Sequence, residues 1–347
     1  MPTLNQITNE TKALIKWGII TIVVIILLFL GIKIGGVVKE IFFPTPAPKP
    51  TVSFGKLPEI ALPKNEQVYN LTYTINTLTG KLPNLPDRTT IYKMQQQKAD
   101  LLAFQRAKDK ADSIGFLSNP TTISEGVYQW ADTDTLERKF TLNTLALEFT
   151  LDSNFYADAK ILSGTNLPSE NNAIILAKNF LTSLSMLTDG IDETKTKTEL
   201  FSIKNYTLIP STSLADTQAI QVNFFQKDID EKPIFYKSPY TPNISLYVTG
   251  GDREQIVKAN YFYQAVTEES ATYPIKTAIQ AFDELQKDQA FFASVPTNIQ
   301  TVLIKNVTLG YFAPSENQEY LMPVIVFEGD NGFFAYVSAI TDEWIDK

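Results

Sequence analysis

The first sixty residues constrain the fold more than any other part of the chain. Residues 17–32 read WGIITIVVIILLFLGI without a charge, and residues 42–58 read FFPTPAPKPTVSFGKLP. The hydrocarbon core of a bilayer is about 30 Å thick and needs about 20 apolar helical residues. The sequence therefore predicts a short tail at 1–12 and a transmembrane anchor at 13–38, crossing through Trp17–Ile34. It predicts a proline-rich stalk at 39–64.

Two other interpretations of the apolar run are a buried helix and a cleaved signal peptide. The run is apolar on every face, which disfavours a helix packed in a water-soluble domain. A signal peptide has an apolar core of about 7–15 residues followed by small residues at the cleavage site. Here the core is longer and Pro44, Pro46 and Pro48 follow it. We therefore expect an uncleaved anchor and an extended stalk rising about 3 Å per residue.

The lysines on either side of the apolar run and the length of the domain that follows it bear on the orientation of this anchor in the membrane. Two lysines precede the run and four follow it: Lys12 and Lys16, then Lys33, Lys39, Lys49 and Lys56. Lysine counting alone would place the stalk in the cytoplasm, but long domains cross membranes largely regardless of charge. We expect a single-pass protein of the cell membrane, with a cytoplasmic N-terminus and the bulk of the chain extracytoplasmic.

Charge and residue usage narrow the classes of function. Residues 1–56 carry a net charge of +4 and the whole chain −8, so residues 57–347 carry −12. Nucleic-acid binding needs clustered Lys and Arg, so we expect no nucleic-acid partner. The chain has no His and no Cys, which excludes a Ser-His-Asp triad, His-ligated zinc and disulfides. We expect a bacterial cell-envelope protein that is not an enzyme and holds no cofactor and no metal.

The pattern of apolar residues predicts an α+β fold built from a recurring unit, a helix covering antiparallel strands. We expect three such units, at 65–168, 169–268 and 269–347. The expected helices cover 94–115, a segment after the N-cap Ser169, and a segment starting at Pro274. The expected strands cover 67–79, 122–130, 139–151, 198–209, 218–226, 244–249, 255–267, 300–312, 320–328 and 332–340, with a hairpin at Gly250–Asp252.

The last third of the chain resembles a known family. The segments are YPIKTAIQAFDELQ at 273–286, IQTVLIKNVTLGYFAP at 299–314 and EYLMPVIVFEGDNGFFAYVSAI at 319–340. They resemble PepSY-like modules, and among these the YycH/YycI-type regulators, which are membrane-anchored extracytoplasmic proteins that modulate a sensor histidine kinase. The resemblance is clearest over 273–340 and includes no catalytic signature. It implies repeated helix-on-sheet units and a regulatory protein that acts by protein contact.

Several short patterns suggest chemistry, and each has a simpler interpretation. Ser53–Lys56 matches the S-x-x-K pattern of penicillin-interacting enzymes, but it lies in the stalk without the SDN or KTG triplets. Oxygen ligands for a hard cation occur at Asp132 and Asp134 and at Asp228, Asp230 and Glu231. Neither group has the third ligand, central Gly and distal Glu of a calcium loop. We expect these carboxylates to be solvated turn residues.

The adjacent carboxylates Asp283-Glu284 and Asp342-Glu343 could suggest a glycosidase pair. Such pairs stand about 5–9 Å apart across a sugar cleft, so we expect the polar face of a helix and of the C-terminal tail instead. Asn-x-Ser/Thr triplets would be glycan sites in a eukaryote, whereas in a bacterium they reflect Asn- and Thr-rich strands. They occur at Asn70, Asn205, Asn243 and Asn306.

Aromatic residues in ANYFYQAV give the one candidate surface. Tyr261 and Tyr263 share one face of the predicted strand, where they form a partner surface unless a helix covers them. We expect a protein that contacts another membrane or envelope protein, such as a sensor kinase or an envelope assembly. The alternatives are a module that binds envelope glycan or peptidoglycan and, third, a hydrolase that works without His.

Overall fold

A computed structural model describes residues 49–347 except 66, 68, 98–99, 133–135 and 347, together with positions 17, 21, 22 and 29. The chain forms two compact units, Met1–Lys49 and Pro50–Lys347. The predicted tail, nearly all of the predicted anchor and the first part of the stalk lie outside the described residues. Within the described part of the chain, no helix has the length and apolarity needed to cross a bilayer.

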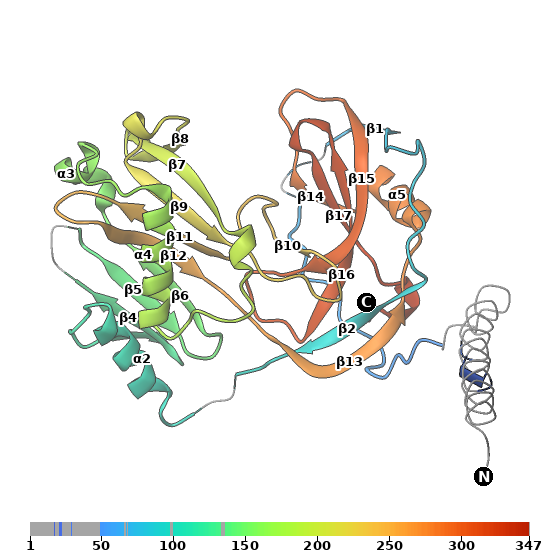
Figure 1. Ribbon diagram of the computed structural model, residues 1–347, viewed down its shortest axis with the longest axis horizontal. Helices are drawn as coiled ribbons and strands as arrows, with labels where there is room; N and C mark the ends of the chain where they lie inside the picture. Colours follow the sequence, from blue (N-terminus) through green and yellow to red (C-terminus); the bar gives the residue numbers. More distant parts are fainter. Residues whose placement is uncertain are drawn as a thin grey trace, which may run out of the picture. The chain divides into compact units, whose positions relative to one another are not determined.

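The first of two sheets in residues 50–347 has eight strands (Figure 1). Its main path runs β1-β15-β16-β17-β14, while β2 joins β13 to β16 and β10 pairs with β15. The strands are β1 (Thr72–Ile75), β2 (Arg88–Met94), β10 (Ile234–Phe235), β13 (Val266–Pro274), β14 (Phe291–Ser294), β15 (Thr301–Phe312), β16 (Tyr320–Gly329) and β17 (Phe334–Ser338). Helix α5 (Ala278–Gln286) packs against this sheet through Ala278, Ala281 and Leu285.

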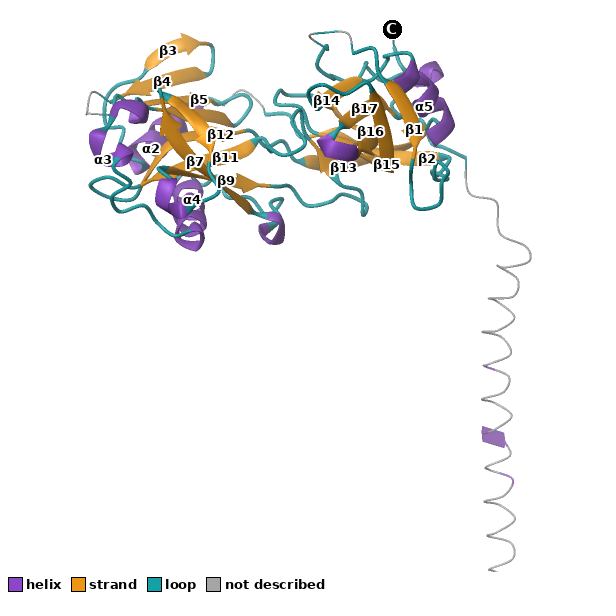
Figure 2. Cartoon of the chain, turned by 90° about the horizontal axis from the view of Figure 1, so that it is seen from above, coloured by secondary structure: helices purple, strands orange, loops and turns teal. Residues whose placement is uncertain are grey.

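The second sheet has nine antiparallel strands in the order β3-β4-β5-β6-β12-β11-β9-β7-β8. They are β3 (Thr121–Ser124), β4 (Val127–Ala131), β5 (Lys139–Asn143), β6 (Glu148–Asp152), β7 (Lys197–Lys204), β8 (Thr207–Pro210), β9 (Ala219–Phe224), β11 (Ile244–Thr249) and β12 (Gln255–Tyr261). Helices α2 (Ala103–Ser113) and α4 (Glu170–Ser183) share one core with this sheet, while α3 (Ala159–Leu162) contributes to another. In Figure 2, α2, α3 and α4 lie beside the nine-stranded sheet, and α5 lies beside the eight-stranded sheet.

The fold is α+β, as predicted, but its units have other boundaries. The segments expected to form separate units at 65–168 and 169–268 share the nine-stranded sheet, because β6 pairs with β12. Strands β1 and β2 instead join the C-terminal sheet through β15, β13 and β16. The edge of a strand presents unpaired backbone N–H and C=O groups, which any other segment of the chain can pair with. Strands from distant parts of the sequence can therefore join the same sheet.

Residues 50–62, the described part of the predicted stalk before Pro63, pack on the eight-stranded sheet. Val52, Phe54 and Ile60 contact the core of this sheet, and Leu57 is fully buried in it. Burying the apolar side chains of this stretch lowers the free energy relative to an extended spacer, in which they would be exposed to water. The part of the stalk prediction that covers residues 50–62 is therefore wrong, and residues 39–48 lie outside the described part.

Local predictions were confirmed where a cap or a turn residue marked the boundary. Ser169 caps α4 by accepting a bond from the Asn172 N–H, and Gly250–Asp252 connects β11 to β12. The strand predicted at 139–151 is wrong, since it is the β5–β6 hairpin. The helix predicted to start at Pro274 is also wrong. Pro274 ends β13, and α5 starts after Thr277, whose capping box with Gln280 fixes the first turn.

Candidate binding site between the two sheets

The chain crosses between the two sheets four times. The crossing segments are 95–102, 225–233, 236–243 and 262–265, which connect β2 to α2, β9 to β10, β10 to β11 and β12 to β13. Connections of this kind carry polar backbone groups and are the usual place for binding residues on a rigid scaffold. Two of these segments, 225–233 and 262–265, line the candidate site.

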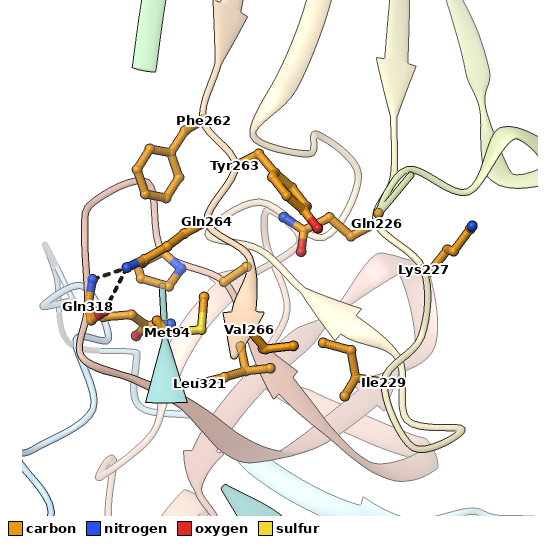
Figure 3. A pocket seen from close by; sticks show the side chains of 13 residues that line it. Met94, Gln226, Lys227, Ile229, Phe262, Tyr263, Gln264, Val266, Gln318 and Leu321 are labelled. Atoms are coloured by element: carbon orange, nitrogen blue, oxygen red, sulfur yellow. Dashed lines mark hydrogen bonds between the residues drawn. The ribbon is translucent and has the colours of Figure 1, made fainter. Parts of the chain in front are cut away.

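A cavity of about 130 Å³ lies beside the β12–β13 crossing, and we call it the crossover cavity (Figure 3). Its apolar lining comes from three strands of the eight-stranded sheet and from the segments that connect strands, and it consists of Met94, Val266, Leu321, Ile229, Phe262, Ala313 and Pro314. Its polar lining consists of Gln226, Lys227, Tyr263, Gln264 and Gln318. None of the described lining residues is Asp or Glu. The cavity is therefore an apolar hollow bordered by amides, one phenol and one ammonium group.

Side-chain amides hold the walls of the crossover cavity in place. Gln264 Nε2 donates to the backbone oxygens of Gln95 (3.1 Å) and Gln318 (2.9 Å), and Gln264 Oε1 accepts from the Gln318 N–H (3.1 Å). Asn243 Nδ2 donates to the oxygens of Ala313 (3.2 Å) and Pro314 (2.9 Å). These bonds satisfy backbone groups outside the strands. They join the crossing segment 262–265 to 95–102, and they hold the segments 236–243 and 262–265 against the loop between β15 and β16.

Tyr263 forms the wall between the crossover cavity and a second cavity of about 270 Å³. A Cβ atom added to Gly190 would lie 1.9 Å from Tyr263 Oη, so the phenol rests directly on the Gly190 backbone. The second cavity also shares Gln264 and is lined by Lys110, Thr188 and Asn317 among others. The position of Tyr263 thus depends on a glycine at 190.

A buried phenol lies next to the crossover cavity. Tyr236, behind the cavity wall, is 2 % exposed, and its Oη accepts from the Gln226 N–H at 2.9 Å. Burial raises the pKa of the Tyr236 phenol well above its usual range, so it stays neutral at physiological pH.

The predicted aromatic surface divides into a core residue and a cavity residue. Tyr261 is 4 % exposed and stacks on Phe149, with ring centroids 5.2 Å apart. It faces the core shared by the nine-stranded sheet and α4, so the prediction of an exposed partner surface is wrong for Tyr261. Tyr263 is half-buried and lines the crossover cavity, and both tyrosines line the second cavity of about 270 Å³.

The structure distributes the other candidate residues over the surface. Ser53 and Lys56 are exposed in a turn in which the Gly55 N–H donates to Val52 O. Asp132 pairs with Arg138 at 2.6 Å, and Asp134 lies outside the described residues. Within the described ranges, no three acidic side chains gather as a possible metal site.

The second acidic group is also divided among different partners. Asp228 pairs with Lys195 at 2.6 Å, and Asp230 accepts a bond from Tyr92 Oη at 2.6 Å. Glu231 is exposed in the same turn. The carboxylates therefore serve separate surface contacts.

The two adjacent carboxylate pairs meet in an unexpected way. Glu284 of α5 and Asp342 near the C-terminus both contact Lys276, at 2.8 and 3.3 Å, while Asp283 and Glu343 are exposed. One member of each pair thus compensates a lysine that is only 8 % exposed. A buried ammonium at their centre makes this an ion-pair network, and it is not the open cleft that a glycosidase needs.

Of the residues that line or support the crossover cavity, the sequence indicated Tyr263 but not the amides. Gln264, Gln318 and Asn243 lie outside regular strands, where an amide gives no periodic signal. The only hint is their place beside strand ends, where backbone groups need partners. Their association depends on which strands pair, so it could not be read from local sequence.

Comparison with known proteins identifies no family. No family model matches the chain, and no curated protein matches it. An uncharacterized protein from Eubacterium rectale ATCC 33656 is 15% identical, with 73% of this chain and 85% of that chain covered and a TM-score of 0.37. The YpeB C-terminal domain of Bacillus megaterium is 12% identical, with 71% and 95% covered and a TM-score of 0.26. At these TM-scores neither likeness assigns a function.

Proposed function

We propose that this chain is a single-pass, membrane-anchored, extracytoplasmic protein that acts by binding another membrane or envelope protein. In this proposal the crossover cavity receives an apolar side chain of the partner. The observation that supports it most is the lining of the cavity, where apolar side chains of the eight-stranded sheet and of the crossing segments meet beside an amide that is already fixed by hydrogen bonds. Anchor residues buried in such pockets carry most of the binding energy at protein interfaces.

The size of the cavity favours a side chain over a free small molecule. Pockets for small-molecule ligands measure about 300–1,000 Å³. The crossover cavity measures about 130 Å³. An apolar cavity of about 150 Å³ accommodates a benzene ring. A Leu or Phe side chain from a partner is therefore the group that suits this space.

Polar groups at the cavity can orient the backbone that carries this side chain. The Gln226 carboxamide lines the cavity, and Lys227 beside it is exposed. A carboxamide offers both a donor and an acceptor, which is what a peptide group needs. The cavity thus combines an apolar anchor site with peptide-like hydrogen bonding.

The regulatory role that we propose rests on the resemblance of residues 273–340 to PepSY-like and YycH/YycI-type proteins. On that basis we propose PepSY-like units in the fold and a regulatory contact, with a sensor kinase or an envelope assembly as the partner. The apolar run Trp17–Ile34 would hold the chain beside such a partner in the membrane. The partner's identity is left to experiment.

Photo-cross-linking in membranes tests the proposal. A benzoylphenylalanine at Lys227 should trap one defined membrane or envelope protein. The same group at Tyr206, a 74 % exposed residue in the β7–β8 turn, should not trap it. Removing Trp17–Ile34 should abolish the product. Equal products from both positions, or retention of the ectodomain by purified cell wall in place of any protein product, would contradict the proposal.

A further inference from the structure

The second cavity, which shares Tyr263 and Gln264 with the crossover cavity, has a chemistry of its own. It measures about 270 Å³, close to the lower end of the range of about 300–1,000 Å³ that small-molecule sites occupy. The parts of its lining used below are Lys110 of α2, the segment 185–187 that follows α4, and Tyr261 at the end of β12. All of these lie in stretches that the structure describes without a gap.

Lys110 lines this cavity with a half-buried side chain that has no carboxylate partner among the described residues. Its Nζ donates to Leu184 O, the C-cap carbonyl of α4, which carries only the partial negative charge of a helix end. An ammonium group has three donors, so two remain for other acceptors. Burial lowers the pKa of Lys110, and the nearby Arg106 adds to this effect. A negative charge bound beside Lys110 would therefore be favourable.

Tyr261 adds a hydroxyl group that has no partner in the protein. Its ring is 4 % exposed and is held in place by stacking on Phe149. Within the described part of the chain its Oη forms no hydrogen bond, and it is not fully enclosed, so a ligand can reach it from the cavity that Tyr261 lines. Buried side-chain polar groups usually have a hydrogen-bond partner. The unpaired hydroxyl thus indicates an acceptor or donor supplied from the cavity.

The charge of the described lining is positive. It includes Lys110 and no Asp or Glu. The undescribed residues 98–99, which follow the lining residue Gln97, are Lys and Ala, so neither is acidic. Glu148 and Glu316 are neighbours of lining residues in the sequence but are not part of the lining. The cavity therefore combines one cation with a phenol donor and favours an anion.

Apolar side chains determine which kind of anion suits the cavity. Leu147, Met186 and Leu187 line it together with the polar groups. Phosphate sites typically gather backbone N–H groups at a helix N-terminus or bidentate Arg side chains. One ammonium, one phenol and an apolar wall instead match a singly charged group that is attached to a hydrocarbon chain. A carboxylate on a short apolar chain has this composition.

We propose that the second cavity binds the carboxylate group of an organic ligand, with its oxygens at Lys110 Nζ and Tyr261 Oη and its hydrocarbon part against Met186 and Leu187. A small carboxylic acid and the C-terminal residue of a peptide both present this chemistry. The inference goes beyond the function proposed above. Its test needs no partner protein, so its failure would leave the crossover cavity and its proposed occupant untouched.

Isothermal titration calorimetry with the full chain in detergent micelles tests the inference, with titration into empty micelles as the blank. The probe is 4-methylpentanoate, and 4-methylpentanamide is the neutral probe of the same shape. We expect the acid to bind and the amide to bind at least tenfold more weakly, since hydrogen bonds to a charged group are the stronger ones. The peptide acetyl-Gly-Gly-Gly-Leu with a free C-terminus distinguishes the two sources. Tighter binding of this peptide than of the free acid would assign the site to peptide C-termini, and the reverse would assign it to small acids.

Two variants locate the site, and each has a matched control. Lys110→Met should weaken binding of 4-methylpentanoate about tenfold or more, and Tyr261→Phe, which keeps the stacked ring, about threefold to tenfold. Lys108→Met makes the same change in charge two residues away on α2, outside the lining. Tyr206→Phe removes the hydroxyl of an exposed tyrosine. Both controls should leave the affinity unchanged.

Four results would overturn the inference. Equal binding of the acid and the amide would remove the role of charge. Unchanged affinity in either Lys110→Met or Tyr261→Phe, in protein shown to be folded by its thermal unfolding, would place the ligand elsewhere. Absence of binding of both the acid and the peptide to the unmodified chain would remove the site. Tighter binding of inorganic phosphate than of either carboxylate would assign the cavity to another class of anion.

Discussion

Leu57 and Ile345 form a parallel β-bridge that joins the start of the described unit to its end. The Leu57 N–H donates to Trp344 O at 2.8 Å, and the Asp346 N–H donates to Leu57 O at 2.8 Å. Leu57 is fully buried and Ile345 is 6 % exposed. The last residues therefore hold in place the segment that follows the predicted anchor.

Removing the Leu57 side chain should destabilise the whole unit. Leu57→Ala leaves a cavity in the core of the eight-stranded sheet, so we expect a loss of about 2–5 kcal/mol in urea unfolding of the full chain. The control Leu78→Ala changes a side chain that is fully exposed. It should alter stability by no more than about 0.5 kcal/mol. Similar losses for the two variants would contradict the burial of Leu57.

The Lys276 ammonium group should stabilise the fold by compensating the negative charges of Glu284 and Asp342. The Lys276→Met variant leaves a half-buried carboxylate at Glu284 without its cation. We expect a loss of about 1–3 kcal/mol, below that of a fully buried pair because Asp342 is largely exposed. Lys305→Met, at an exposed lysine, serves as the matched control in thermal unfolding. Unchanged stability of Lys276→Met would show that the network contributes nothing.

Contact between Gly190 and Tyr263 should appear as energetic coupling. A methyl group at 190 would collide with the Tyr263 ring, so Gly190→Ala should cost about 1–3 kcal/mol. In a Tyr263→Ala background the same change should cost less than about 0.5 kcal/mol. A double-mutant cycle in urea measures this coupling. Equal losses of stability from Gly190→Ala in both backgrounds would show that the Tyr263 side chain does not contact Gly190.

Glu328 should make stability depend on pH. Burial raises the pKa of its carboxyl above the ordinary glutamate value, so the native state holds this proton more tightly than the unfolded chain does. Stability therefore falls as pH rises from the ordinary glutamate pKa through the raised native pKa, and the loss persists at neutral pH. Glu328→Gln removes this cost, by less than about 1 kcal/mol for a half-buried group.

The gain from Glu328→Gln should be present at neutral pH and vanish below the ordinary glutamate pKa. Urea unfolding at several pH values measures it, with Glu125→Gln at an exposed turn position as the control. The same gain at every pH, or the same profile for both variants, would mean that ionisation of Glu328 is not its cause.

Sequence patterns predicted elements whose boundaries are set by neighbouring residues. Ser169 and the apolar stripe after it located α4, and Gly250-Gly251 located a hairpin. The β5–β6 hairpin was missed because its turn has no Gly or Pro. Asn143 Oδ1 forms the turn instead, by accepting bonds from the N–H groups of Leu145 and Ala146.

Sheet membership could not be predicted from local sequence. Nothing within Thr72–Ile75 specifies β15 as its partner, since backbone pairing is common to all strands. The crossover cavity depends on another such pairing, because Met94 of β2 and Leu321 of β16 meet only after these two strands have paired. Tyr263 was identified from the sequence. The alternation of residues along the strand places Tyr261 on the same face as Tyr263, but it does not show that Tyr261 is buried.

The central claim is that an apolar side chain of a partner occupies the crossover cavity. Val266→Phe fills this cavity from its own wall, and Ile209→Phe enlarges a 41 % exposed side chain on β8 as the control. The direct measurement is the amount of the partner identified by cross-linking that co-purifies with each full-length variant from membranes. The account predicts a loss of about tenfold or more for Val266→Phe, as expected for a central anchor, and none for Ile209→Phe. Equal recovery of the partner with both variants, at equal levels of folded protein, would contradict it.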